Sequence, residues 1–418
     1  MTDMLASPAA FAAVHTALRS GVQTPAYVYD LAEVRANAVR LRAALPERSE
    51  IYYSLKANPH PAILDTLREQ GARAEVCSVG ELDESLAAGW PPDTLLYTGP
   101  GKRDQDLRHA LRRGVREFSV DSPIGLDQLD RLAGEAGVQA RCLLRINDDQ
   151  PVPGQGLTMT GVASQFGVDV SWVFADPARF TGGLNAPVVG LHLYMGTNMT
   201  EVHDLLAQFG RSLATAAQLR CALARHGVRL RVVDLGGGFG APFACVGEPV
   251  VLSGLRDGLY RLLDAELPGW RDGAVRVVFE SGRYLVGTAG TLVTRVLDVK
   301  RSHGRDLVVL ESGINHLGGM SGLRRLPPLN PHLLSDTAAG DLRPTMVAGP
   351  LCTPLDLWSR NAPLSPLHPG DTLQVPNVGA YGLSASLLAF LSHPTPTEVA
   401  VDGDQVTHVS RLHLTRKG

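Results

Sequence analysis

The stretch Ile51-Tyr52-Tyr53-Ser54-Leu55-Lys56-Ala57-Asn58-Pro59 is a short apolar and aromatic run that ends in a lysine. Such a run predicts a buried strand, and the Asn-Pro pair breaks it before a helical pattern begins. An amine at the mouth of a buried strand is partly desolvated, which favours its neutral, nucleophilic form. Lys56 is therefore a candidate for a covalent bond to a carbonyl group, although an isolated strand-end lysine usually only extends its amine into water.

Similar runs recur on both sides of this one and alternate with helical patterns such as 31–44, 81–88 and 205–225. The predicted strands are 26–29, 51–55, 74–77, 95–98, 117–120, 142–146, 188–194, 231–235 and 275–279. Repeated strand–helix units predict a parallel sheet, and about eight units in roughly 250 residues fit a closed (β/α)8 barrel. An open doubly wound sheet is the alternative, because periodicity does not reveal closure.

After Arg283 the pattern changes to short β-like runs between turns rich in glycine and proline, at 292–299, 307–311, 345–348, 372–375 and 406–414. Such runs predict a second, antiparallel β domain. We therefore assign residues 26–280 to the barrel and residues 281–418 to a C-terminal β domain. Residues 1–25 are expected to pack beside the second domain.

The composition argues against several classes of function. The net charge of −3, with scattered Lys and Arg, offers no basic surface for nucleic acid or a membrane. No apolar run approaches the roughly 20 residues that span a bilayer. The beginning of the chain lacks a basic start followed by an apolar block, and the five cysteines form no metal-binding or disulfide pattern. A cytoplasmic protein without a metal site is the expectation.

Glycines and charged residues follow two of the predicted strands. Gly236-Gly237-Gly238-Phe239-Gly240 follows strand 231–235, and Glu280-Ser281-Gly282-Arg283 follows strand 275–279. Glycines let backbone N–H groups approach an anion, and Arg283 adds a permanent charge. A lone glycine loop is more often a tight turn, but with a strand-end lysine it predicts a phosphate near an amine. This combination favours pyridoxal 5′-phosphate, a phosphorylated aldehyde that is anchored by lysine.

The chain resembles the barrel-type pyridoxal-phosphate decarboxylases of ornithine, diaminopimelate and related amino acids. The motifs that carry the resemblance occur in the family's order over nearly the whole chain. They are YSLKAN (53–58), GELD (80–83), HLYMGTN (192–198), DLGGGFG (234–240), ESGR (280–283), GPLC (349–352) and GAYG (379–382).

The resemblance implies roles for individual residues. Lys56 would form the Schiff base with the cofactor, and Glu280 would keep the pyridine nitrogen protonated so that the ring withdraws electrons. Arg145 would lie near the phenolic oxygen. Cys352 resembles a catalytic cysteine that is contributed across a homodimer interface and controls protonation after carbon dioxide leaves. The implied phosphate ligands are Thr197, Gly237, Gly238, Arg283 and Tyr381.

Several positions depart from the family pattern. Tyr194 replaces a histidine that stacks on the cofactor, a role that another aromatic ring can fill. Thr353 stands where an acidic residue commonly binds a distal substrate amine. Gln165 replaces a basic residue, which argues against a cross-subunit ion pair with Asp356. His316 lies in a loop, 315–320, that lacks the carboxylate-binding arginine of diaminopimelate enzymes.

We count Thr353, His316 and Asp356 as candidate substrate residues. The departures argue against ornithine and diaminopimelate, and they favour a modified or conjugated amino acid of a siderophore or antibiotic pathway. A diaminopimelate- or ornithine-type decarboxylase of primary metabolism is the alternative. An amino-acid racemase on the same fold is disfavoured by Glu280. A cofactor-holding protein without activity is disfavoured by the presence of both Lys56 and Cys352.

Overall fold

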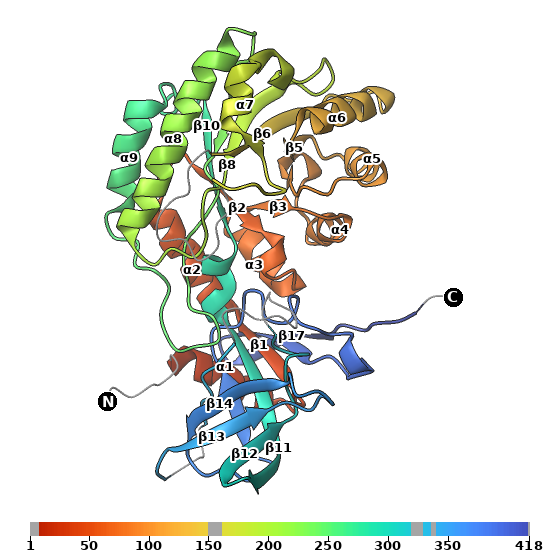
Figure 1. The fold of residues 1–418 in the computed structure, drawn as a ribbon, viewed down its shortest axis with the longest axis vertical. Helices are drawn as coiled ribbons and strands as arrows, with labels where there is room; N and C mark the ends of the chain where they lie inside the picture. Colours follow the sequence, from red (N-terminus) through yellow and green to blue (C-terminus); the bar gives the residue numbers. More distant parts are fainter. Residues whose placement is uncertain (1–7, 149–160, 319–328, 336–339, 417–418) are drawn as a thin grey trace. The chain divides into compact units, whose positions relative to one another are not determined.

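The computed structural model describes residues 8–148, 161–318, 329–335 and 340–416. The chain folds into two compact units, each assembled from separate stretches (Figure 1). The barrel unit comprises residues 37–240 and 250–284, and the sheet unit comprises residues 1–36, 241–249 and 285–418. Within the described residues, no helix is long and apolar enough to cross a membrane.

The barrel unit is built on a closed ring of parallel strands, in which β10 pairs with β2 and β5 pairs with β6. In the described part of the chain the ring consists of β2 (Glu50–Ser54), β3 (Arg73–Val76), β4 (Leu96–Tyr97), β5 (Glu117–Val120), β6 (Arg141–Asn147), β8 (Val188–Leu193), β9 (Val232–Asp234) and β10 (Arg276–Ser281). The short β7 (Val168–Asp169) pairs with the end of β6. The predicted barrel is confirmed, and an open sheet is excluded because the ring has no free edge.

Helices follow most ring strands and begin where the sequence supplies a suitable first turn. Proline begins α3 (Pro61–Glu69), a position where its missing N–H leaves no helical bond unmade. Ser122 caps α6 (Pro123–Glu135), because its hydroxyl accepts the N–H of Gly125 at 3.0 Å. The other helices associated with the barrel strands are α2 (Leu31–Ala44), α4 (Val79–Ala87), α5 (Asp104–Arg112), α7 (Val170–Ala175), α8 (Val202–Ala224), α9 (Leu255–Glu266) and α10 (Arg283–Val286).

The barrel interior has an apolar middle with polar side chains on either side of it. The middle cluster consists of Tyr52, Leu96, Leu143, Val232 and Val278, all buried. Inward-facing positions recur at every second residue of a strand, so the next inward-facing residues lie two positions before and after the cluster residues. Several of these residues are charged. Charged residues precede this cluster on β2, β6 and β10, and others follow it on β6, β9 and β10.

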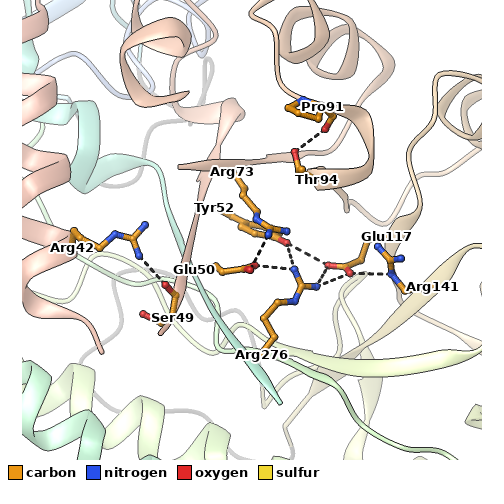
Figure 2. A network of polar contacts seen from close by, with 10 residues as sticks. All are labelled: Arg42, Ser49, Glu50, Tyr52, Arg73, Pro91, Thr94, Glu117, Arg141 and Arg276. Carbon is orange, nitrogen blue, oxygen red and sulfur yellow. Dashed lines mark hydrogen bonds and ion pairs between the residues drawn. The ribbon is translucent and has the colours of Figure 1, made fainter. Parts of the chain in front are cut away.

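The charged residues at the amino ends of the strands form one network around Arg276 (Figure 2). The Arg276 guanidinium donates to both carboxylate oxygens of Glu117 at 2.7 Å and to Glu50 at 2.8 Å. Arg73 lies 2.9 Å from Glu50, and Arg141 lies 3.4 Å from Glu117. These five are the first residues of β10, β5, β2, β3 and β6. The network therefore ties together the starts of strands that are far apart in the sequence.

The sheet unit contains a mixed sheet of order β14-β13-β12-β11-β1-β16-β17, with β15 paired to β11. Its strands in the described residues are β1 (Ala26–Asp30), β11 (Gly290–Ser302), β12 (Arg305–Leu310), β13 (Arg343–Ala348), β14 (Leu357–Leu364), β15 (Thr372–Val375), β16 (Thr397–Asp402) and β17 (Gln405–Arg411). Most neighbours are antiparallel, whereas β1–β16 and β12–β13 are parallel. The predicted β domain is confirmed, with these two parallel pairs in addition.

Helix α1 (Pro8–Arg19) packs on this sheet through a small apolar cluster. Val14 and Ala17 of the helix are fully buried with Val28 of β1, Val293 of β11 and Val399 of β16. The N-terminal helix thus shares its core with the central strands of the sheet unit.

One predicted barrel strand belongs elsewhere, which is a correction to the sequence analysis. Residues 26–29 form β1, which pairs antiparallel with β11 and parallel with β16 in the sheet unit. All four side chains are buried, and a run buried on both faces fits the middle of either sheet equally well. The compact barrel unit accordingly begins at residue 37, extends to residue 284 and leaves residues 241–249 to the sheet unit. Strands β14 and β16 were not predicted.

We expect Arg276→Met to lower the free energy of unfolding by about 3 kcal/mol, because it leaves the buried carboxylate of Glu117 without its main cation. The side chain of Glu117 is 4% exposed and that of Arg276 is 25% exposed, so solvent cannot easily replace the pair. Urea unfolding followed by circular dichroism measures the loss.

The matched control is Arg271→Met, which removes an arginine of similar geometry from an exposed pair with Asp264. This control should leave the unfolding midpoint almost unchanged. Equal losses in the two variants would show that the network at the amino ends does not stabilise the barrel.

Candidate active site

Polar side chains gather at the carboxyl ends of the ring strands, which is the end where barrel enzymes place their active sites. They come from separate elements: Lys56 from the short helix η1 (Leu55–Ala57), Glu75 from β3, Arg145 from β6, His192 from β8, Asp234 from β9 and Glu280 from β10. The structure thus places three predicted residues, Lys56, Arg145 and Glu280, at the same end of one barrel.

Lys56 projects from a one-turn helix whose other two residues are buried. Its Nζ lies 3.8 Å from Oε2 of Glu75, a side chain that is only 3% exposed. Burial opposes ionisation of Glu75, but the Lys56 charge and hydrogen bonds from Ser54 and Thr98 outweigh it, so the pKa of Glu75 is lowered. The side chain of Lys56 is 47% exposed, which is less desolvation than the sequence predicted.

Glu280 lies in a fully buried group of titratable side chains. Its Oε1 is 3.4 Å from Nε2 of His192, and one ligand atom each from Glu280, His192 and Asp234 lie within 4.8 Å of one another. The three side chains come from the neighbouring ring strands β8, β9 and β10. Burial raises the pKa of Glu280 well above its ordinary value, and the nearby carboxyl groups of Asp234 and Glu75 raise it further.

The glycine loop after β9 is held close to its neighbours at several points. The N–H of Gly236 donates to Asp234 at 2.8 Å, and the Gln208 amide donates to the carbonyl oxygen of Gly237 at 2.8 Å. A Cβ at position 236 would lie 2.5 Å from the Tyr194 ring, and one at position 237 would lie 2.5 Å from the carbonyl oxygen of Glu280. Only glycine fits here, so the loop can present its backbone to an anion.

The loop that carries Tyr194 and Thr197 lies beside this glycine loop. The N–H of Met199 donates to the carbonyl oxygen of Gly238 at 2.8 Å, which joins the two loops. Asn198 adopts a left-handed conformation with φ of 57°, which gives the segment a sharp turn. Two predicted phosphate-binding segments are therefore adjacent.

The turn that carries Arg283 approaches the turn that carries Lys56. A Cβ at Gly282 would lie 2.8 Å from the Cβ of Ala57, so this close approach requires glycine. Arg283 begins the short helix α10 directly after this position. The arginine predicted for the phosphate and the lysine predicted for the aldehyde thus belong to neighbouring turns.

Arg145 is buried at the end of β6, with its guanidinium 4.6 Å from the centroid of the Phe166 ring. A cation stacked on an aromatic face is stabilised by the ring's negative surface. The positive charge of Arg145 also acts on Glu75 and Glu280, lowering the pKa of each. Arg145 therefore offsets part of the negative charge at this end of the barrel.

The other predicted site residues, Cys352, Thr353, Asp356, His316 and Tyr381, belong to the sheet unit. Cys352 is exposed, and Tyr381 adopts a left-handed conformation with φ of 57°. The roles of Cys352, Thr353 and Tyr381 stay predictions.

Asp356 and His316 make contacts that favour a structural role over the predicted substrate contact. The buried carboxylate of Asp356 accepts the N–H groups of Ile314 and Leu351, each at 2.8 Å. His316 has Nε2 2.9 Å from the carbonyl oxygen of Pro394 and Nδ1 3.3 Å from the Ser312 hydroxyl. Burial lowers the pKa of His316 to about 4. Both side chains hold the backbone of their own unit together.

Sequence reasoning missed Asp234 and Gln208 as parts of the site. Asp234 stands two residues before the glycine run and two residues after the apolar Val232, and this alternation was the available signal. Gln208 lies on α8, and a single glutamine on an amphipathic helix gives no sign that it holds a loop after a distant strand.

Comparison with known proteins agrees with this geometry. The model of a family described as "Pyridoxal-dependent decarboxylase, pyridoxal binding domain" matches residues 31–287. The chain is 30% identical to L-glutamyl-[BtrI acyl-carrier protein] decarboxylase of Niallia circulans, over 92% of this chain and 90% of that protein.

Two further similarities are relevant to substrate and fold. The chain is 29% identical to 2-[(L-alanin-3-ylcarbamoyl)methyl]-2-hydroxybutanedioate decarboxylase of Staphylococcus aureus, over 88% of this chain and 92% of that protein. The structure of diaminopimelate decarboxylase from Helicobacter pylori in complex with L-lysine is similar at a TM-score of 0.82 and 26% identity. This match covers 94% of this chain and 95% of that one.

The residues of the barrel unit fit a pyridoxal phosphate cofactor. Glu280 has a buried carboxylate oxygen, Oε1, without a hydrogen-bond partner among the described residues, which a protonated ring nitrogen would supply. The glycine loop has no space for side chains and can present its backbone to a phosphate. The cofactor and the donors in the barrel are therefore compatible.

We expect the stability of the cofactor-free protein to fall as the pH rises from about 4 to about 8, in part through Asp234. Burial raises the pKa of Asp234 from 3.8 to about 8, so the folded protein retains a proton that the unfolded chain releases. This contribution is fully present below pH 4 and is lost as the pH rises through 8. Asp234→Asn should flatten the decline in the urea midpoint across this interval.

The control for this measurement is Asp264→Asn, at an exposed aspartate whose pKa is lowered by hydrogen bonds from Arg271. It should leave the decline between pH 5 and 8 unchanged. A decline of the same steepness in Asp234→Asn and in the unmodified protein would contradict the assignment.

Proposed function

The chain belongs to the pyridoxal-dependent decarboxylase family, and from this we propose that it removes carbon dioxide from a modified or conjugated amino acid. The family match and the curated relatives support an amino-acid decarboxylase that uses pyridoxal phosphate. The observation that carries the proposal is the convergence of Lys56, Glu280 and the glycine loop at one end of the barrel.

In the proposed site, each part of the cofactor has its own protein partner. Lys56 holds the aldehyde covalently, and Glu280 binds the ring nitrogen. Arg283 and the backbone of Gly237 and Gly238 bind the phosphate, with Thr197 beside them. The bound cofactor supplies an electron-accepting ring for the bond that breaks. The protein residues orient that ring and hold its nitrogen protonated.

The amine of Lys56 has a second task in this proposal. With a substrate in the site, the free amine of Lys56 would lie next to Glu75, whose ionised carboxylate is 3.8 Å away. A carboxylate at this distance keeps the released amine close to the reacting centre. Glu75 would therefore position the amine of Lys56 at the site.

Two sequence positions support a conjugated substrate over a free diamino acid. Thr353 is neutral where an acidic residue would bind a distal amine, and Gln165 is neutral where a basic residue is expected. Two of the similar proteins are named for an acyl-carrier-bound glutamyl substrate and for a citryl-type conjugate. A conjugated substrate needs neither of the missing charges at these positions. We place the enzyme in a siderophore or other natural-product pathway.

Cys352 and the oligomeric state complete the proposal. We assign Cys352 to protonation of the product carbon, contributed by the partner subunit of a homodimer. Its exposed thiol in the sheet unit is compatible with such a placement. Equilibrium sedimentation and the complementation of Lys56→Ala by Cys352→Ala in mixed dimers test this part.

We expect Lys56→Ala to abolish covalent cofactor binding. In the unmodified protein, borohydride reduction should attach the cofactor to the peptide that contains Lys56, as read by mass spectrometry, and should trap the visible absorbance band. The variant should show neither effect. Lys102→Arg is the matched control, because Lys102 is the other described lysine of the barrel unit and contacts Gly99 and Asp121.

Attachment of the cofactor to a peptide other than the one with Lys56 would refute the role of this lysine. A well-folded protein that binds no pyridoxal phosphate at all would refute the proposed function as a whole.

The substrate class is tested by carbon dioxide release from a panel of amino acids. We expect turnover of a carrier-bound glutamyl thioester or of citryl-diaminopropionate to exceed that of ornithine, lysine and meso-diaminopimelate at least 100-fold, a difference of about 2.7 kcal/mol in transition-state binding. Efficient turnover of any of the three free amino acids would overturn the proposal for a conjugated substrate.

A further inference from the structure

Three polar atoms in the barrel interior lack hydrogen-bond partners among the described residues, although their side chains lie close together. They are Oε1 of Glu280, Nε2 of His192 and Oδ2 of Asp234, and the three side chains are at most 3% exposed. Buried polar atoms are normally paired, so an unpaired set of this kind requires an explanation. Protons shared within the trio, or given to a bound group, provide one.

The imidazole of His192 is the first member to consider. Burial lowers its pKa well below the ordinary value, and the charges of Arg145, Lys56 and Lys102 lower it further. His192 is therefore neutral and carries one proton. Its Nδ1 lies 2.8 Å from the hydroxyl of Ser119, which is itself fully buried.

The position of that proton follows from the neighbours of the ring. Nε2 faces a carboxyl oxygen of Glu280 at 3.4 Å, whereas Nδ1 faces a hydroxyl that can donate as well as accept. With the proton on Nε2, His192 donates toward Glu280 while Ser119 donates to Nδ1. This arrangement gives both ring nitrogens a partner, and when Glu280 is ionised the opposite tautomer would set two acceptors against each other.

Asp234 and Glu280 cannot both be ionised in the same dry space, because their charges repel at short range. Asp234 accepts the N–H of Gly236 on Oδ1, whereas its Oδ2 is buried without a hydrogen-bond partner among the described residues. The charged groups that act on Glu280 are Lys56 and Arg145, which favour its carboxylate, and Glu75 and Asp234, which oppose it. A cation bound directly at Glu280 would decide which acid ionises.

We propose that Asp234 retains a proton in the working enzyme, while His192 donates its Nε2–H to Glu280 and so makes Glu280 the single carboxylate that faces the cofactor's ring nitrogen. Both are positioning residues, because they act on the cofactor through Glu280. The inference rests on the proposed function for the position of the ring nitrogen, whereas the protonation of Asp234 does not depend on it.

The first test concerns Asp234 and uses infrared difference spectroscopy of the cofactor-loaded protein at neutral pH. Asp234→Asn should lose part of the absorption of protonated carboxyl groups that is present in the unmodified protein. Asparagine can still accept the Gly236 N–H, so the loop should keep its conformation. Asp264→Asn should retain the whole band. An unchanged band in Asp234→Asn would overturn this part of the proposal.

The second test concerns His192 and uses cofactor labelled with ¹⁵N in its ring. The label's chemical shift distinguishes a protonated from an unprotonated ring nitrogen. We compare His192→Gln, whose amide keeps a donor, with His192→Leu, which has none. The glutamine variant should keep the signal of the protonated nitrogen, and the leucine variant should shift toward the unprotonated form, because Glu280 without its donor binds the proton more tightly.

Each outcome decides a separate question. The same ¹⁵N shift in both His192 variants and the unmodified protein would overturn the role of His192. Failure of the unmodified protein to bind the labelled cofactor would refute the proposed function, while the infrared comparison of Asp234→Asn, repeated without cofactor, would still decide whether Asp234 carries a proton.

Discussion

The pairing of β10 with β2 is the constraint on which the rest of the structure depends. It closes the ring and brings Glu280 into register with Tyr52, four residues before Lys56. Lys56, the proposed anchor for the cofactor, and Glu280, the proposed partner of its ring nitrogen, come from distant parts of the chain, and closure of the ring brings their strands together. The ion network around Arg276 joins the opposite ends of these same two strands. The ion network and the proposed active site thus lie at opposite ends of the same strands.

The apolar cluster around Leu143 separates these two polar regions and allows them to differ in character. At the amino ends, Glu117 and Glu50 form salt bridges with Arg276. At the carboxyl ends, Asp234 and Glu280 meet each other and a neutral histidine, so burial raises both pKa values. A carboxylate that is already paired with arginine gains little from a second cation. A buried carboxyl group without such a partner is stabilised in its ionised form by a bound cation. This contrast supports the proposal that the cofactor binds at the carboxyl ends of the strands.

Much of this could be predicted from the sequence, for reasons that are physical. Eight ring strands were found because strands buried on both faces are continuous apolar runs, as at 51–55 and 142–146. Lys56, Glu280 and the glycine loop were found because their residue types are unusual at strand ends. The same logic failed for β1, since an apolar run does not reveal its partner. Asp234 and Gln208 were missed because their importance lies in distant contacts, Glu280 for one and Gly237 for the other.

The central position of β1 has a consequence for how the protein comes into being. This strand lies between β11 and β16, whose residues are synthesised long after it. The stretches that close the barrel, by contrast, are all present once residue 284 has been made. During synthesis one edge of β1 stays unpaired until β11 has been made and the other until β16 has been made, and such long-range pairing is slow. The docking of β1 between both of its neighbours therefore requires that synthesis has passed residue 402.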